Sequence, residues 1–333
     1  MDLRGATGLP DAARMMNRRA FLGVMTAATV APPVLAGARP GRLPTRVLGR
    51  TGLRVPILGF GSGSRFLMYA DDDQAIAALN RALDLGIRYI DTAHSYGDGK
   101  SETRVGRVMA TRRAEVVLGT KLAARTAEQA RRQLELSLKR LQTDHVDVLH
   151  IHALKNLDDL RAIEAKGGVL DALYEARDQK IARAIGITCH ADPVALEAAL
   201  ERHDFDCTQM ALNAGLTNMT EAMQTVPAAP ASFEQRALPV ALRKRMGVIA
   251  MKVFGQEHLL GAAAPADLLR YALSLPVSLC SVGMPRPELI ERNATLAQTF
   301  RPMAESQRRR LVDSIEAGRK HALRAFFHDH EDA

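Results

Sequence analysis

The chain has no tryptophan, few aromatic residues and three cysteines among its 333 residues. Cys189, Cys207 and Cys280 lack the spacing of a metal-binding motif, and each falls in or beside a segment predicted to be a strand. We therefore expect three buried thiols, with no disulfide required for folding. There is also no low-complexity tract and no internal repeat beyond the alternation of strands and helices described below.

The balance of charge argues against one class of partner. The formal net charge is +8, but the basic residues are not interleaved with aromatic ones, and no nucleic-acid-binding motif is present. We therefore expect no DNA or RNA binding, whereas a modest basic excess favours anionic cofactors or surfaces. With 47% hydrophobic residues, the chain can bury the core of one full-sized domain.

Short apolar segments recur along the chain at intervals that fit a strand, a helix and the next strand. Between two of them, residues 127–141 carry leucines at helical spacing. Eight such strands alternating with helices predict a (β/α)₈ TIM barrel, an α/β fold, and the tail from Arg301 predicts an added C-terminal helix. The eight predicted strands are residues 56–61, 87–91, 116–121, 146–152, 182–188, 205–210, 247–252 and 277–283.

Four polar residues stand at or just after the ends of three of these strands. Asp91, Lys121 and His152 lie 30 and 31 residues apart, and Tyr96 follows Asp91 closely. Because catalytic groups of this barrel sit at the carboxyl ends of its strands, we expect the four side chains to meet at one mouth of the barrel.

These residue types suit the reduction of a carbonyl. Hydride addition to the carbonyl carbon leaves an oxyanion, so a group must donate a proton as the charge develops. Tyr96 is the candidate acid, and a nearby Lys121 ammonium would lower the pKa of its phenol, while Asp91 would hold Lys121 charged and oriented. His152 would orient the carbonyl by donating to its oxygen.

Three segments carry a resemblance to a known family. They are the G-x-x-x-x-D-T-A-x-x-Y-G-x-G-x-S-E pattern of residues 86–102, the opening residues 48–61 and the closing residues 281–293. From about Arg46 to Ala297 the chain resembles the aldo-keto reductases. The resemblance implies an N-terminal β-hairpin before the first strand, an NADP or NAD cofactor across the barrel mouth, and reduction of a small aldehyde or ketone to an alcohol.

The resemblance also implies a set of cofactor contacts, with departures from the usual pattern. Met251 stands where many members have a tyrosine that stacks on the nicotinamide, and Leu289 stands where many NADP-preferring members have an arginine. Thr188 and Cys189 replace a common Ser-Asn pair, so the choice between NAD and NADP stays open. The expected cofactor-binding residues are Thr188, Gln209, Met251, Lys252, Arg286 and Asn293.

The substrate pocket is expected to be wider and less aromatic than in typical members. His152 is followed by Ala-Leu where those members have Trp-Pro. The residues expected to form the apolar wall are Phe66, Met68, Tyr69 and Phe254. The long Pro/Ala-rich segment 213–233 is interpreted as a lid over substrate or cofactor, with a plain surface insertion as the alternative.

Two other functions compete with the reductase interpretation. His150 and His152 form a His-x-His pair that could ligate a metal in an amidohydrolase-type enzyme. The residues that could complete the coordination shell are His94, His190, Asp91 and Lys121. We expect no metal, and interpret His150 as a buried, hydrogen-bonded core residue and His94 and His190 as surface loop residues. The third possibility is a non-catalytic subunit that senses nucleotides.

The N-terminal segment resembles a twin-arginine export signal. Arg18 and Arg19 precede Ala-Phe-Leu, a short apolar stretch follows, and Ala36-Gly-Ala38 fits a cleavage site. The apolar stretch is too short for a comfortable membrane span, so we expect no stable insertion. We accordingly predict a signal peptide at residues 1–38, a single barrel domain at residues 39–333, the twin-arginine export machinery as a partner, and a periplasmic location.

Overall fold

The computed structural model describes residues 42–216, 232–255 and 259–315 of the chain. All of them lie in the unit formed by residues 32–333. The predicted signal peptide, most of the segment 213–233 and the end of the C-terminal tail fall outside the described residues.

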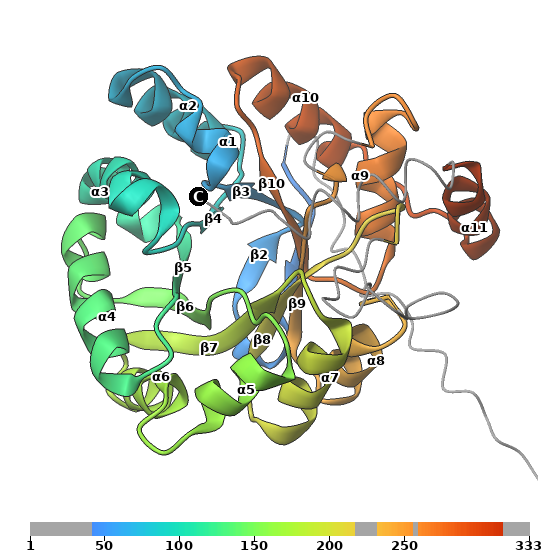
Figure 1. The fold of residues 1–333 in the computed structure, drawn as a ribbon. Coiled ribbons are helices and arrows are strands. Elements are labelled where there is room, and N and C mark those ends of the chain that lie inside the picture. The colour runs from blue at the N-terminus through green and yellow to red at the C-terminus, as the bar shows by residue number, and fades with distance from the viewer. Residues whose placement is uncertain (1–41, 217–231, 256–258, 316–333) are drawn as a thin grey trace, which may run out of the picture. The chain divides into compact units, whose positions relative to one another are not determined.

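Eight parallel strands close into a barrel in the order β10-β3-β4-β5-β6-β7-β8-β9 (Figure 1). Each strand pairs in parallel with the strand that follows it in this order, as the alternation of strands and helices predicted. The predicted barrel is therefore confirmed. The barrel strands are β3 (Leu58–Gly61), β4 (Tyr89–Asp91), β5 (Val117–Leu122), β6 (Val146–Ile151), β7 (Ala182–Cys189), β8 (Cys207–Ala211), β9 (Gly247–Met251) and β10 (Leu279–Gly283).

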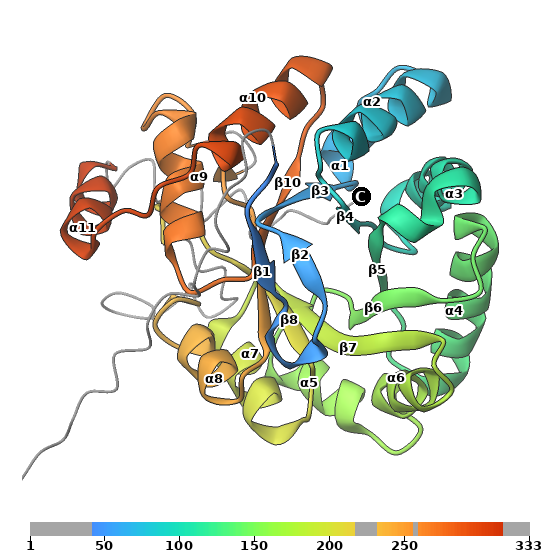
Figure 2. The same cartoon turned by 180° about the vertical axis from the view of Figure 1, so that it is seen from behind.

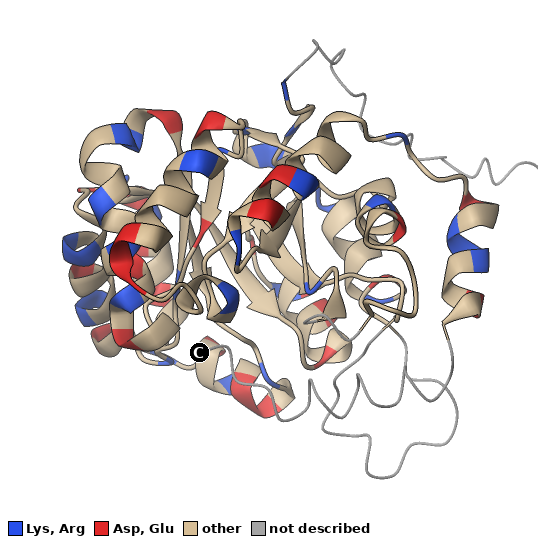
Figure 3. Ribbon diagram, turned by 90° about the horizontal axis from the view of Figure 1, so that it is seen from above, with Lys and Arg blue, Asp and Glu red and all other residues tan. Residues whose placement is uncertain are grey.

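Helices surround the barrel (Figure 1). Buried apolar side chains of these helices belong to the same core cluster as side chains of the strands. The helix α4 has the bounds that its leucine spacing predicted, and it begins where the Thr126 hydroxyl accepts a hydrogen bond from the amide of Gln129. Acidic and basic residues are interspersed on the outer helices (Figure 3). The α-helices are α1 (Ser64–Leu67), α2 (Asp72–Asp84), α3 (Lys100–Arg112), α4 (Ala127–Leu141), α5 (Leu157–Glu164), α6 (Val169–Asp178), α7 (Pro193–Arg202), α8 (Ala237–Arg243), α9 (Pro265–Ser274), α10 (Pro287–Gln298) and α11 (Glu305–Ser314).

The last of these helices, α11, is the predicted C-terminal helix. Three 3-10 helices, η1 (Gly49–Thr51), η2 (Tyr96–Gly99) and η3 (Arg113–Glu115), complete the helical elements of the described residues. None of the helices in this part of the chain has the length and apolar character needed to cross a membrane.

An antiparallel hairpin of β1 (Thr45–Val47) and β2 (Arg54–Pro56) precedes the barrel, as the resemblance implied (Figure 2). Its turn, η1, lies against the start of β9, where a side chain on Gly49 would stand 2.0 Å from the amide nitrogen of Gly247. Leu48, Leu53 and Val55 of the hairpin pack against side chains from inside the barrel. The hairpin therefore covers the amino-terminal end of the barrel, and the opposite end remains for a site.

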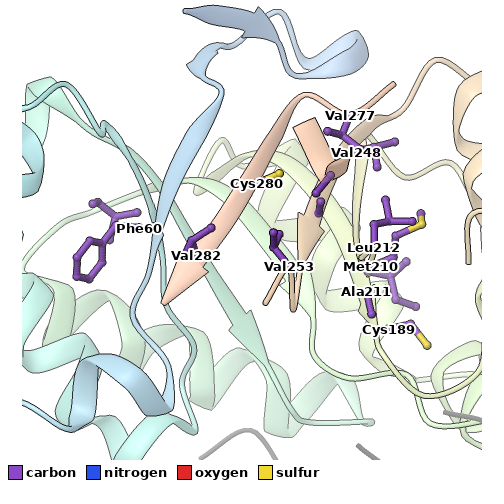
Figure 4. Close-up of a cluster of buried hydrophobic side chains, with 14 of the residues drawn as sticks. Phe60, Cys189, Met210, Ala211, Leu212, Val248, Val253, Val277, Cys280 and Val282 are labelled. Atoms are coloured by element: carbon purple, nitrogen blue, oxygen red, sulfur yellow. The ribbon is translucent and has the colours of Figure 1, made fainter. Parts of the chain in front are cut away.

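The larger core lies between the strands and the helices. Figure 4 shows part of it, with Phe60, Met210, Val248 and Val282 among the buried side chains. The three cysteines are buried and free of disulfides, as predicted.

Candidate active site

The four residues predicted at the barrel mouth do meet there. Asp91 ends β4, Lys121 lies near the end of β5, and His152 directly follows β6. Tyr96 begins η2, the short 3-10 turn after β4. The parallel pairing of β4, β5 and β6 places their carboxyl ends side by side, which brings together residues far apart in the sequence.

Lys121 is the centre of the group. Its Nζ lies 3.0 Å from Asp91 Oδ2, 2.8 Å from the carbonyl oxygen of Thr92 and 3.2 Å from the Tyr96 hydroxyl. The lysine and aspartate side chains are almost completely buried. In such surroundings the ion pair is shielded from water, and the ammonium acts at short range on the phenol.

Two further residues hold the Asp91 carboxylate. Its Oδ2 accepts hydrogen bonds from Gln209 Nε2 at 3.0 Å and from Ser281 Oγ at 3.3 Å. The contact from β8 comes from the opposite side of the barrel, and the contact from β10 comes from the next strand but one. Ser281 was not predicted as a site residue, although it lies in the closing segment that carries the family resemblance.

His152 lies beside Tyr96, with their ring centroids 5.4 Å apart and the rings nearly perpendicular. Its Nδ1 lies 3.3 Å from Ser95 Oγ, a contact that sequence reasoning missed. This contact orients the imidazole relative to the phenol, because Ser95 directly precedes Tyr96 in the chain.

A cavity of about 240 Å³ opens at this end of the barrel. Of the residues predicted for the site, those that line the cavity are Asp91, Tyr96, Gln209, Met251, Lys252, Arg286 and Asn293. Lys121, His152 and Thr188 are not among the lining residues. The Thr188 hydroxyl accepts a hydrogen bond from the amide of Ala153 instead. Thr188 therefore supports the loop that follows His152.

Comparison with known proteins decides the family. The sequence model of the aldo/keto reductase family matches residues 57–310, more than half of the chain. The chain belongs to the aldo/keto reductase family.

Individual relatives are more distant. The chain is 34% identical over 161 residues to L-galactose dehydrogenase of Arabidopsis thaliana, a match that covers 44% of this chain and spans about half (49%) of that protein. It is 29% identical over 254 residues to D-threo-aldose 1-dehydrogenase of a Pseudomonas species, covering 66% and 72% of the two chains. A Klebsiella pneumoniae aldo-keto reductase solved in complex with NADPH shares the fold, with a TM-score of 0.64, 21% identity, and coverage of 81% and 94%.

The cavity of this aldo/keto reductase has the chemistry that a nicotinamide dinucleotide requires. Gln209 Oε1 is a buried acceptor with no hydrogen-bond partner among the described residues, which fits the amide group of a nicotinamide. The same cavity is lined by four basic residues, whose charges suit phosphate groups. They are Arg65, Lys252, Arg286 and Arg292. Arg65 and Arg292 were not predicted, although Arg292 directly precedes Asn293 in the closing segment.

The apolar wall predicted for the substrate pocket is mostly wrong. Phe66 is fully buried and packs edge-to-face on Phe60, and Tyr69 is buried with its hydroxyl donating to the carbonyl oxygen of Met284. Met68 is 60% exposed, and only Phe254 of the four lines the cavity. The loop after β3 turns its aromatic rings into the core because they fill the space between the barrel and α3.

The prediction of surface loop histidines is wrong for His190 and holds only in part for His94. His94 is half-buried, with Nδ1 3.2 Å from Ser137 Oγ, and burial together with the charge of Arg140 lowers its pKa. His190 is buried rather than a surface residue.

His150 is buried as predicted, but neither of its ring nitrogens has a hydrogen-bond partner among the described residues. Burial and the nearby charges of Lys121 and His152 hold its pKa well below the usual value. The imidazole of His150 is therefore neutral, because its buried position beneath Lys121 disfavours a charged ring.

The hydrolase interpretation requires a set of metal ligands. Among residues 42–216, 232–255 and 259–315, no three His, Cys, Asp or Glu side chains are placed so that they could hold a metal ion. Within this described part of the chain, the pair formed by His150 in β6 and His152 after it has no third ligand of these types.

Proposed function

We propose that this aldo/keto reductase is an NADPH- or NADH-dependent oxidoreductase that reduces aldehydes or ketones to alcohols. The observation that carries the proposal is the contact of 3.2 Å between Lys121 Nζ and the Tyr96 hydroxyl, within a buried group beside the cavity. Membership of a family whose relatives include named dehydrogenases supports it.

Tyr96 is the proposed proton donor. It lines the cavity, where a carbonyl oxygen can reach its hydroxyl. The Lys121 ammonium stabilises the phenolate that remains after the proton has left, and Asp91 fixes the position of the ammonium through the contact of 3.0 Å. The proton thus passes from the tyrosine oxygen to the oxygen of the substrate.

His152 is the proposed orienting residue. A ring nitrogen that donates to the carbonyl oxygen holds the substrate and takes up part of the developing negative charge. Ser95 supports this role, because its contact with Nδ1 fixes the orientation of the imidazole beside Tyr96.

The cofactor proposed for this cavity is NADPH or NADH. When bound, it supplies the hydride that adds to the carbonyl carbon. Gln209 and Asn293 would hold its amide and adenosine parts, Met251 would contact the nicotinamide ring, and the basic residues of the cavity would hold the phosphates. The NADPH complex of the Klebsiella pneumoniae protein, which has the same fold, supports the assignment.

Carbonyl-dependent oxidation of the nucleotide tests this function. Purified protein should oxidise NADPH or NADH when aldehydes or ketones from a test panel are added. This activity should persist after exhaustive chelation of metals. Loss of activity in chelator that one divalent metal restores would favour the hydrolase. Tight nucleotide binding without turnover on any carbonyl would favour the sensing subunit.

We further propose that the protein is exported by the twin-arginine machinery to the periplasm, with residues 1–38 as the signal and residues 39–333 as the barrel domain. The sequence around Arg18 and Arg19 supports this assignment. The pathway carries folded proteins, which suits an enzyme that binds its nucleotide in the cytoplasm.

A further inference from the structure

The backbone that follows Tyr96 has an unusual conformation. Gly97, Asp98 and Gly99 all have positive φ, at 57°, 51° and 90°. A non-glycine residue such as Asp98 rarely adopts this left-handed conformation, and it persists where the surroundings impose it. The position of the Tyr96 hydroxyl depends on this turn, so something outside the turn must hold it.

Arg140, near the end of α4, is the group that contacts the turn. Its Nη2 donates to the carbonyl oxygen of Asp98 at 3.2 Å, and its Nη1 donates to the carbonyl oxygen of His94 at 3.2 Å. The two contacts lie on either side of Tyr96 in the sequence. One guanidinium therefore holds both ends of the segment that carries the phenol.

Two glycines leave room for this arginine. A side chain on Gly99 would stand 2.1 Å from the guanidinium carbon of Arg140, and a side chain on Gly106 would stand 2.0 Å from the Arg140 carbonyl oxygen. The end of η2 thus packs closely against the side chain of Arg140, and helix α3 packs closely against its backbone.

Glu102 extends the contact to the strand that carries Lys121. It is fully buried and lies in the Ser-Glu end of the family pattern, for which the proposed reaction has no direct use. Its Oε2 lies 3.5 Å from Arg140 Nη1, and its Oε1 accepts a hydrogen bond of 2.7 Å from the hydroxyl of Thr120, the neighbour of Lys121. Burial raises the pKa of Glu102, while Thr120, Ser137 and Arg140 act in the opposite direction.

We propose that Arg140 and Glu102 are positioning residues that set the distance between Tyr96 and Lys121. Arg140 holds the turn that carries the phenol, and Glu102 connects it to the strand that carries the ammonium. The proposal rests on the proposed function for its catalytic consequence, but the arrangement of the turn itself does not depend on the substrate. Neither residue touches the cavity, so neither takes part in the proton transfer directly.

The variants Arg140→Ala, Arg140→Lys and Glu102→Gln test the proposal. A loosened turn moves the phenol relative to the carbonyl, and a misplacement of about 1 Å can cost roughly a hundredfold in rate. We expect Arg140→Ala to lower kcat by about 10- to 100-fold, while the dissociation constant of NADPH changes by less than about threefold. Arg140→Lys should recover part of the loss, because a lysine can reach one carbonyl oxygen but not both.

Arg131→Ala is the matched control. Arg131 lies on the same helix and bridges to Glu175 on α6 at 2.7 Å, far from the turn, so its loss should leave kcat and NADPH binding at the parental values. Amide hydrogen exchange gives a readout besides activity. Residues 94–99 should exchange faster in the Arg140 and Glu102 variants than in the parent, and should be unchanged in Arg131→Ala.

The exchange measurement distinguishes a failure of the proposed function from a failure of the proposed positioning role of Arg140 and Glu102. If the parent reduces no carbonyl, the proposed function fails, and the exchange of residues 94–99 still decides whether Arg140 holds the turn. If Arg140→Ala does not fold, Arg140→Lys takes its place in both measurements. A folded Arg140 variant with parental kcat and parental exchange would overturn the inference.

Discussion

At the scale of single residues, the arrangement of donors around Lys121 defines the chemistry available to Tyr96. An ammonium has three N–H donors, and Lys121 directs them to Asp91, to Thr92 and to the Tyr96 hydroxyl. The phenol oxygen accepts in the last of these contacts, so the contact does not use the phenolic proton. Donation of that proton to a substrate oxygen is thus compatible with the observed geometry.

Cofactor preference is also decided by single residues. Leu289 stands at the usual arginine position, so recognition of the 2′-phosphate should rest on Arg286 or Lys252, with Arg292 as a third candidate from the cavity. A charge-assisted contact of this kind contributes about 1.5 to 3 kcal/mol, or roughly ten- to a hundredfold in affinity. We expect a weak preference for NADPH that Arg286→Ala or Lys252→Ala reduces by that factor, with little change in NADH binding.

Dissociation constants of both nucleotides for the parent and the alanine variants check this expectation. A parental preference for NADPH of several thousandfold that neither substitution alters would mean that other groups hold the phosphate.

The sequence predicted those site residues that lie at the end of a strand or within a pattern of the family. Asp91, Lys121 and His152 could be predicted because the strand spacing fixes where each one emerges. Ser95 and Arg292 could not be distinguished from ordinary polar residues, because their roles depend on side-chain contacts across the site.

At the scale of elements, the barrel strands and α4 follow from local patterns. The apolar segments are short and regularly spaced, and Leu134, Leu138 and Leu141 of α4 pack on the core at helical spacing. Such features are set by the local sequence, so the prediction agrees with the structure.

The loops after β3 and β4 depend on packing between distant segments. Phe66 is buried because Phe60 and the guanidinium of Arg104 surround it, with the Arg104 carbon 5.8 Å from the ring centroid. A sequence pattern cannot show whether a loop aromatic faces a cavity or a core. The left-handed turn after Tyr96 likewise depends on Arg140, which lies 42 residues beyond Asp98.

At the scale of the whole molecule, closure of the barrel assembles the site. Asp91 and Ser281 lie 190 residues apart, yet their side chains are in contact because β10 pairs with β3 and β3 pairs with β4. The hairpin covers the other end of the barrel. The cavity beside Tyr96 is therefore a consequence of the topology as a whole.

The proposed export depends on the N-terminal residues of the chain rather than on the barrel. Replacing both arginines, Arg18→Lys with Arg19→Lys, should keep the protein in the cytoplasm, because the export receptor reads the two guanidinium groups and the rest of the signal is weakly apolar. Fractionation of cells that express the parent or the double variant measures this directly. Equal periplasmic amounts of the two proteins would show that the arginine pair does not direct export.

The central claim is that Tyr96 donates the proton in carbonyl reduction, and the Tyr96→Phe variant tests it most directly. The substitution removes the hydroxyl and leaves the ring, so the fold and the cofactor contacts should survive. The measurement is the rate of carbonyl-dependent NADPH oxidation alongside the NADPH dissociation constant. We predict a rate lower by about a hundredfold or more with nucleotide binding retained. A Tyr96→Phe protein that reduces the same carbonyl at the parental rate would contradict the account.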